Sequence, residues 1–163
     1  MSGSAVETLG ELGACLVLAT AQTAAPGVNA TAQEVFMPGE RFTLAWTHSI
    51  EKVRWEEDYR IVVPKVHGSS ERPQLLIEAA RIRGTGAGME PPADAVLKDG
   101  WYHYHPKTPS PYEQRLTRSP YTADYEWCSA DKQCQPMGEL LLSDGGITLL
   151  RPCRAPRPAA PRR

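Results

Sequence analysis

Between Arg41 and Cys153, apolar and polar residues alternate along most of the chain. In 53–63 the alternation is clearest, because apolar or aromatic side chains occupy every second position except Glu57. A period of two is the period of a β-strand, in which successive side chains point to opposite faces. The pattern predicts strands over 42–46, 53–63, 75–83, 101–105, 114–118, 121–127, 139–143 and 147–150.

Turn-forming residues separate these segments. Asp144-Gly145-Gly146, between the last two strands, is typical of a tight hairpin. The 15 Pro and 13 Gly of the chain suit many turns and short strands. We expect helical turns only within the first twenty residues and over 92–98. The predicted fold class is therefore all-β, a small sandwich or barrel of about seven to eight mostly antiparallel strands.

The beginning of the chain differs from this middle part. A short apolar run that ends at Ala21 resembles the apolar core and cleavage site of a secretory leader. However, Glu7 and Glu11 stand where a leader carries basic residues, and the run is too short to span a bilayer as a helix. We interpret the chain as a weak leader or flexible arm, a single β domain and a disordered Pro/Arg tail, over 1–40, 41–153 and 154–163.

Composition excludes few functions. The chain has 163 residues, a formal charge of −1 and a pI of about 6.4. This length fits one domain with a modest core. The near-neutral charge gives no reason to expect nucleic acid or an anionic membrane as a partner.

The most unusual segment is 46–59. It combines His48 with three Glu, one Asp, two basic residues, two Trp and one Tyr. Large aromatic side chains are those that a domain tends to cover. Their mixture with charged residues indicates a pocket wall or a face that meets a partner.

Five segments of the chain together resemble the bacterial domain-of-unknown-function 1850 family: 46–52, 55–59, 84–92, 118–121 and 125–128. The likeness extends over roughly 42–153, and its most specific parts are His48-Ser49 and Gly86-Ala87-Gly88-Met89. The resemblance implies a small protein with an apolar leader, encoded beside the membrane subunits of TAXI-type tripartite (TRAP) transporters, and without established enzymatic activity. It therefore favours a periplasmic or otherwise extracytoplasmic location, with TRAP transporter subunits as expected partners.

His48-Ser49 follows a predicted strand, where it could contact a ligand. A Ser beside a His is not an activated nucleophile, since neighbouring strand residues point to opposite faces. The Gly-x-Ser-x-Gly elbow of serine hydrolases is also absent. The structural alternative is a histidine whose ring hydrogen-bonds a backbone carbonyl or a carboxylate to fix a turn. We expect no catalytic residue here.

Three glycines alternate in 84–88, a loop that could bind an anion through its amides or could form a β-bulge. It is neither a P-loop nor a dinucleotide fingerprint, because the Gly-Lys-Ser/Thr ending is missing and Pro91-Pro92 follows where a helix should open. We therefore expect no cofactor. Arg81 and Arg83 precede the loop on one strand face and could offer bidentate charge to a carboxylate.

A metal site is the alternative interpretation. His103 and His105 are two residues apart, so they share one face of a strand, and His48 with one carboxylate from Glu51, Glu56 or Glu57, taken here as Glu56, would complete a set of four ligands. Nothing in the local sequence brings these side chains together. The runner-up function is therefore a metal-dependent hydrolase that uses these four residues.

The four cysteines are Cys15, Cys128, Cys134 and Cys153. The spacing of Cys128 and Cys134 does not fit a zinc knuckle. In an exported protein, two of the three C-terminal cysteines would form a disulfide that pins the last hairpin. The third thiol is then left over unless Cys15 is retained.

We therefore predict a non-enzymatic accessory or binding protein that recognises a small anionic solute or a transporter subunit. We expect no transmembrane span in the mature chain. A single site requires the strand over 75–83 to lie beside, or one strand removed from, the strand that ends at Trp46. The predicted recognition residues are His48, Ser49, Glu51, Arg54, Arg81, Arg83, Gly86, Gly88, Met89 and Glu90.

Overall fold

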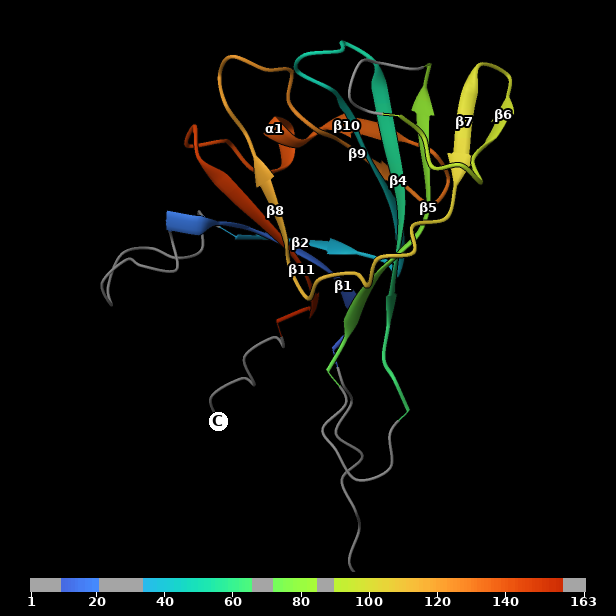
Figure 1. The fold of residues 1–163 in the computed structure, drawn as a ribbon. Coiled ribbons are helices and arrows are strands. Elements are labelled where there is room, and N and C mark those ends of the chain that lie inside the picture. Colours follow the sequence, from blue (N-terminus) through green and yellow to red (C-terminus); the bar gives the residue numbers. More distant parts are fainter. Residues whose placement is uncertain (1–9, 21–33, 66–71, 85–89, 157–163) are drawn as a thin grey trace, which may run out of the picture.

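Two antiparallel β-sheets face each other in a computed structural model that describes residues 10–20, 34–65, 72–84 and 90–156 (Figure 1). The small sheet has four strands in the order β2 (Glu34–Pro38), β1 (Leu12–Leu18), β11 (Ile147–Arg154) and β8 (Gln114–Thr117). The large sheet has seven, in the order β10 (Cys134–Pro136), β9 (Glu126–Ser129), β3 (Arg41–Thr47), β4 (Arg54–Val62), β5 (Gln74–Arg83), β7 (Trp101–Tyr104) and β6 (Val96–Lys98).

The predicted all-β fold is confirmed, and of its two forms the sandwich fits, because the sheets do not close into a barrel. Within the described residues the chain forms eleven strands rather than seven or eight. β8 and β11 diverge from β4 and β5 toward the top of the view, and β6 and β7 lie beyond the small sheet (Figure 1). Part of the large sheet's inner face is therefore not covered by the small sheet.

Strands β1 and β2 come from the segment that the sequence assigned to a leader or flexible arm. β1 lies inside the small sheet and pairs with β2 on one side and β11 on the other. Leu16 faces the main core, while Val17 packs in a second apolar cluster with Leu149. A strand that is covered on both faces reads as a continuous apolar run, which resembles the apolar part of a leader.

Two predicted strands in the C-terminal third are wrong. Residues 139–143 do not form a strand, because the helical turn α1 (Met137–Leu140) places Met137 and Leu141, four residues apart, in the core. The hairpin expected around Asp144-Gly145-Gly146 is therefore absent. The strand predicted over 121–127 begins only at Glu126, since Asp124 turns to bind Arg118. In the segment 92–98, where a helical turn was expected, residues 92–95 form a single hydrogen-bonded turn and residues 96–98 form β6.

The core lies between the sheets and is centred on aromatic rings of the large sheet. The ring of Phe42 stacks on Trp127 at 4.0 Å between centroids and on Tyr59 at 5.1 Å. Trp127 is buried, whereas Trp46 and Trp55 are half-buried and stack on each other at 5.9 Å. These rings fix the spacing between β3, β4 and β9.

All four cysteines are paired. Cys128 and Cys134 join neighbouring strands β9 and β10, which confirms a disulfide among the three C-terminal cysteines. Cys15 and Cys153 join β1 to β11 across 138 residues of sequence. The thiol expected to be left over is therefore the partner of Cys15. No helix within the described residues is long and apolar enough to cross a membrane.

Candidate functional site

A carboxylate points toward the space between the two sheets from the middle of β4. The strand alternation directs Trp55, Glu57, Tyr59 and Ile61 to the inner face, which carries the core. The hydroxyl of Tyr59 donates a hydrogen bond to Glu57 Oε2 at 2.5 Å. Glu57 is therefore the charged residue that breaks the apolar stripe of β4, and it lies among aromatic and aliphatic side chains.

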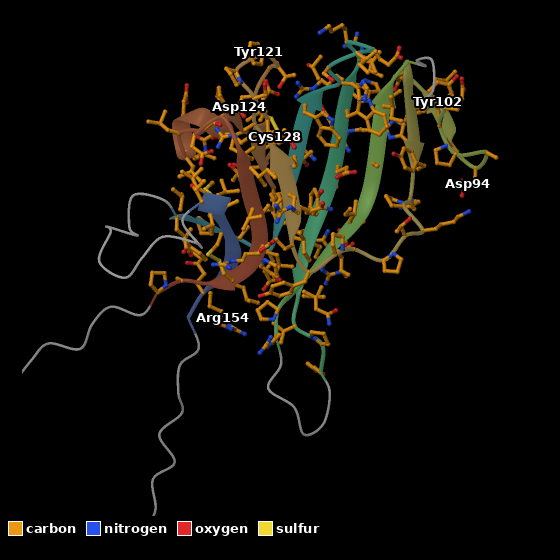
Figure 2. The ribbon with its side chains drawn as sticks, turned by 60° about the vertical axis from the view of Figure 1, so that its left-hand side comes forward. Asp94, Tyr102, Tyr121, Asp124, Cys128 and Arg154 are labelled. Atoms are coloured by element: carbon orange, nitrogen blue, oxygen red, sulfur yellow. A yellow bond between two sulfur atoms is a disulfide. The ribbon has the colours of Figure 1, made fainter. Side chains whose placement is uncertain are left out.

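Glu57 borders a hollow of about 740 Å³, which we call the inter-sheet hollow. Its walls include Ile77 of β5, Tyr104 of β7 and Gln114 of β8. Two rim segments complete it, 92–94 and 105–111, and Asp94 of the first rim is labelled in Figure 2. The volume is in the range of small-molecule sites.

Three polar contacts hold the rim in place. The backbone N–H of Ile77 donates to Ser110 Oγ at 2.7 Å, and the ring of His105 donates through Nδ1 to the carbonyl of Glu78 at 2.7 Å. An ion pair of 2.8 Å between Lys107 and Asp94 joins the two rim segments. These contacts fix the two rim segments to β5 and to each other, so backbone as well as side chains bounds the hollow.

The electrostatic environment of Glu57 is unusual for this chain. Burial raises the pKa of the Glu57 carboxyl, and the hydrogen bond from Tyr59 only partly offsets this effect. Burial also raises the pKa values of Tyr104 and Tyr125, and the negative charge of Glu57 raises both further. Among the residues that the structure describes, no cation lies within ion-pair distance of Glu57, and Tyr59 provides its one hydrogen bond.

A second hollow of about 250 Å³, the His48 hollow, lies at the end of β3. Glu51 donates its backbone N–H to His48 Nδ1 at 3.3 Å, so a neutral His48 ring carries its proton on Nε2. The ring lies 6.2 Å from that of Trp55. The other lining side chains are rich in hydroxyl groups and belong to Trp46, Thr47, Ser49, Thr117, Ser119, Thr122, Ala123 and Tyr125.

The outer face of the large sheet carries a chain of ion pairs. Arg54 bonds Glu126 at 2.5 Å and Glu56 at 2.8 Å, and Arg81 bonds Glu56 at 2.6 Å and Asp58 at 2.8 Å. Burial opposes the ionisation of Asp58, but hydrogen bonds from Arg81 and Thr43 prevail, so the pKa of Asp58 is lowered. Both guanidinium groups are therefore neutralised by carboxylates of their own sheet.

The predicted recognition residues divide between these places. His48 and Ser49 line the His48 hollow, and Glu51 closes its turn. Arg54 and Arg81 lie in the outer-face network, and the guanidinium of Arg83 lies 5.8 Å from the centroid of the Trp101 ring. Glu90 is exposed, whereas Gly86, Gly88 and Met89 lie outside the described residues.

Strand β5 is one strand removed from β3 and runs parallel to it, as the single-site hypothesis requires. The glycine loop therefore starts from the same end of the sheet as His48. Arg81 and Arg83 do not line the His48 hollow, because the alternation of side chains along β5 places both on the outer face of the large sheet.

The alternative metal ligands do not converge. His103 pairs with Arg81 on β5, whereas His48 lines the His48 hollow and His105 bonds the carbonyl of Glu78. Glu56 is held by two arginines. Within the described part of the chain, no group of three or more His, Cys, Asp or Glu side chains could hold a metal ion.

The family described as "Domain of unknown function (DUF1850)" matches residues 42–136. The chain belongs to the DUF1850 family. The DUF1850 match spans nearly all of the large sheet together with β8, and all residues that line both hollows fall inside it. Strands β1, β2 and β11 lie outside it. Among curated proteins and among solved structures, none matches this DUF1850 chain.

Sequence reasoning considered Glu57 only as one of three carboxylates that could complete a metal site, and not as the centre of a separate hollow. The signal was present, because Glu57 was the single interruption of the apolar stripe over 53–63. An inward position occupied by a carboxylate costs free energy unless a partner or a ligand compensates. No pattern in the sequence indicated that Gln114 of β8 lines the same hollow, because the position of β8 near β4 depends on its pairing with β11.

Proposed function

We propose that this DUF1850 protein is a non-enzymatic, extracytoplasmic binding protein that serves a TRAP-type solute transport system and holds a small solute in the inter-sheet hollow. The observation that carries the proposal is Glu57, an inward carboxylate without a cationic partner among the described residues, at the wall of a hollow of about 740 Å³. Such a group reduces stability in the free protein and is compensated when a ligand binds.

Two further observations support this assignment. Paired cysteines persist in oxidising compartments and are rare in the cytosol, and all four cysteines of this chain are paired. No hydrogen bond joins Ser49 to His48 in the described part of the chain, so this motif lacks the contact that activates a nucleophile. The first observation favours a location outside the cytoplasm, and the second favours a binding role over a catalytic one.

Docking on a transporter subunit is the second candidate function. Ile50 and Tyr121 are 79% and 94% exposed, on the two loops that flank the His48 hollow. Tyr121 stands at the loop end of the molecule near Asp124, opposite the end that carries Arg154 (Figure 2). Exposed large apolar side chains beside a polar hollow are typical of a contact surface.

The solute-binding proposal is tested with a panel in which each carbon skeleton occurs as a carboxylate, an amine and an alcohol. Thermal unfolding is measured for the wild type and two matched variants, since a bound ligand raises the unfolding temperature. Ala93→Trp adds a bulky side chain at the exposed rim of the inter-sheet hollow. Ala130→Trp makes the same change at an exposed position beside a hollow on the outer face.

We expect at least one solute to stabilise the wild type and Ala130→Trp but not Ala93→Trp. Binding that is lost in Ala130→Trp and kept in Ala93→Trp would move the site to the outer face and refute the proposal. The absence of any stabilising solute in the panel would also refute it. Fractionation of the producing cells tests the location, which the proposal requires to be extracytoplasmic.

A further inference from the structure

We infer that the inter-sheet hollow selects a small organic cation, a quaternary ammonium or a protonated amine, and that Glu57 is the residue that binds its charge. This inference rests on the proposed function and names the chemical class of its ligand. It departs from the anionic solute that the sequence suggested. Four properties of the described residues carry it.

The first property is a contrast between the two faces of β4. Glu56 and Asp58, the neighbours of Glu57, point to the outer face, where arginines bind them at 2.6 to 2.8 Å. Glu57 points to the inner face and reaches no Lys, Arg or His within the described residues. The protein thus supplies cations to the carboxylates on one face and leaves the inner carboxylate without one.

The second property is unused hydrogen-bonding capacity. An ionised carboxylate accepts at about four lone-pair sites, and Glu57 receives one hydrogen bond, from Tyr59 to Oε2. Its Oε1 has no partner among the described residues. An ammonium group would supply the missing donors, or the missing positive charge, at the wall of the hollow.

The third property is the surrounding surface. Tyr104 and Glu57 both line the hollow, and four prolines lie on its rim, Pro92, Pro106, Pro109 and Pro111. Aromatic faces attract cations through the ring quadrupole, and proline methylene groups offer an apolar surface to alkyl substituents. This combination suits a cation whose charge is partly shielded by carbon.

The fourth property is the position of the basic groups. Lys107 at the rim already pairs with Asp94 at 2.8 Å, and Arg54 and Arg81 are bound by carboxylates on the opposite face of the sheet. His105, also at the rim, donates its ring N–H to a backbone carbonyl. An anion in the hollow would meet the charge of Glu57 without an unpaired cation among these residues to offset it.

The inference is tested by isothermal titration with tetramethylammonium, choline and putrescine as cationic probes at millimolar concentration. The uncharged isostere of choline, 3,3-dimethylbutan-1-ol, and acetate serve as neutral and anionic comparisons. Glu57→Gln keeps the shape and the acceptor for Tyr59 but removes the charge. Glu34→Gln, at an exposed position on the edge strand β2, is the matched control for net charge.

We expect at least one cationic probe to bind the wild type and Glu34→Gln alike. Glu57→Gln should weaken this binding roughly ten- to a hundredfold, as for the loss of a charge-assisted contact. Ala93→Trp should abolish it, and 3,3-dimethylbutan-1-ol should bind far less tightly than choline.

Two results would overturn the inference in distinguishable ways. If a neutral or anionic solute binds in a manner that Ala93→Trp blocks and Glu57→Gln leaves unchanged, the hollow is a binding site but not a cation site, and the proposed function stands. If none of the three cationic probes binds, the cation inference is refuted. If no solute of any class gives binding that depends on the hollow, the proposed function is refuted as well.

Discussion

The two disulfides should differ strongly in their contribution to stability, because they close loops of very different length. Cys15 and Cys153 are 138 residues apart in sequence, and Cys128 and Cys134 are 6 apart. A cross-link restricts the unfolded chain more when its loop is longer. The chain-entropy relation gives about 5 kcal/mol for the long loop and about 2 kcal/mol for the short one.

The measurement uses two double variants, Cys15→Ala with Cys153→Ala and Cys128→Ala with Cys134→Ala. Each removes two sulfur atoms, so the difference between them reports mainly the loop length. At about 3 °C per kcal/mol for a chain of this size, we expect the unfolding temperature to fall by about 15 °C and about 6 °C. Both variants are compared with the wild type by thermal unfolding without reductant.

The control is the wild type in reductant, which should lose more stability than either variant alone. A thiol assay on the denatured wild type should detect no free thiol before reduction and all four afterwards. Equal losses in the two variants, or a larger loss from the short loop, would refute the loop-length argument. Free thiols in protein purified without reductant would refute the pairing itself.

Three other substitutions test the description of the core and the site. Burial raises the pKa of the Glu57 carboxyl above its ordinary value of 4.5, so the protonated carboxyl favours the folded state. This contribution to stability is complete below pH 4.5 and is lost as the pH rises through the folded-state pKa. Glu57→Gln should therefore unfold at a higher temperature than the wild type near neutral pH, but not below about pH 4. Arg118→Met should cost about 3–5 kcal/mol in urea unfolding because the buried guanidinium holds an ion pair and a backbone carbonyl, whereas Arg115→Met on the exposed face should cost less than about 0.5 kcal/mol. Gly13→Ala should cost at least about 2 kcal/mol, since its Cβ would lie 2.2 Å from the carbonyl oxygen of Met37; an unchanged urea midpoint would show that β1 and β2 do not pair as described.

The alternation over 53–63 was sufficient to predict β4 and the division of its side chains between two faces. The same alternation places Arg54 and Glu56 opposite Glu57, so the separation of the ion-pair network from the inter-sheet hollow was implicit in the sequence. The strand β1 could not be recognised in this way. Both of its faces are covered, so its apolar run carries no period of two.

The candidate site needed information that no local pattern contains. The approach of Gln114 to Glu57 depends on the pairing of β8 with β11, and β11 in turn pairs with β1. The turn α1 replaced a predicted strand because it places both Met137 and Leu141 in the core, to which strands of both sheets contribute. Tertiary packing therefore overrides local preference where distant segments share one core.

The pairing of β1 with β11 also sets the order in which the molecule can be assembled. Seven residue pairs, from Leu12 with Arg154 to Leu18 with Thr148, join the first described strand to the last. All strands of the large sheet precede β11, so a growing chain can complete that sheet while β1 still lacks its inner neighbour. Contacts between such distant segments form slowly, and an apolar strand that waits for its partner is prone to aggregate. We therefore expect the yield of folded protein to depend on the pairing of β1 with β11.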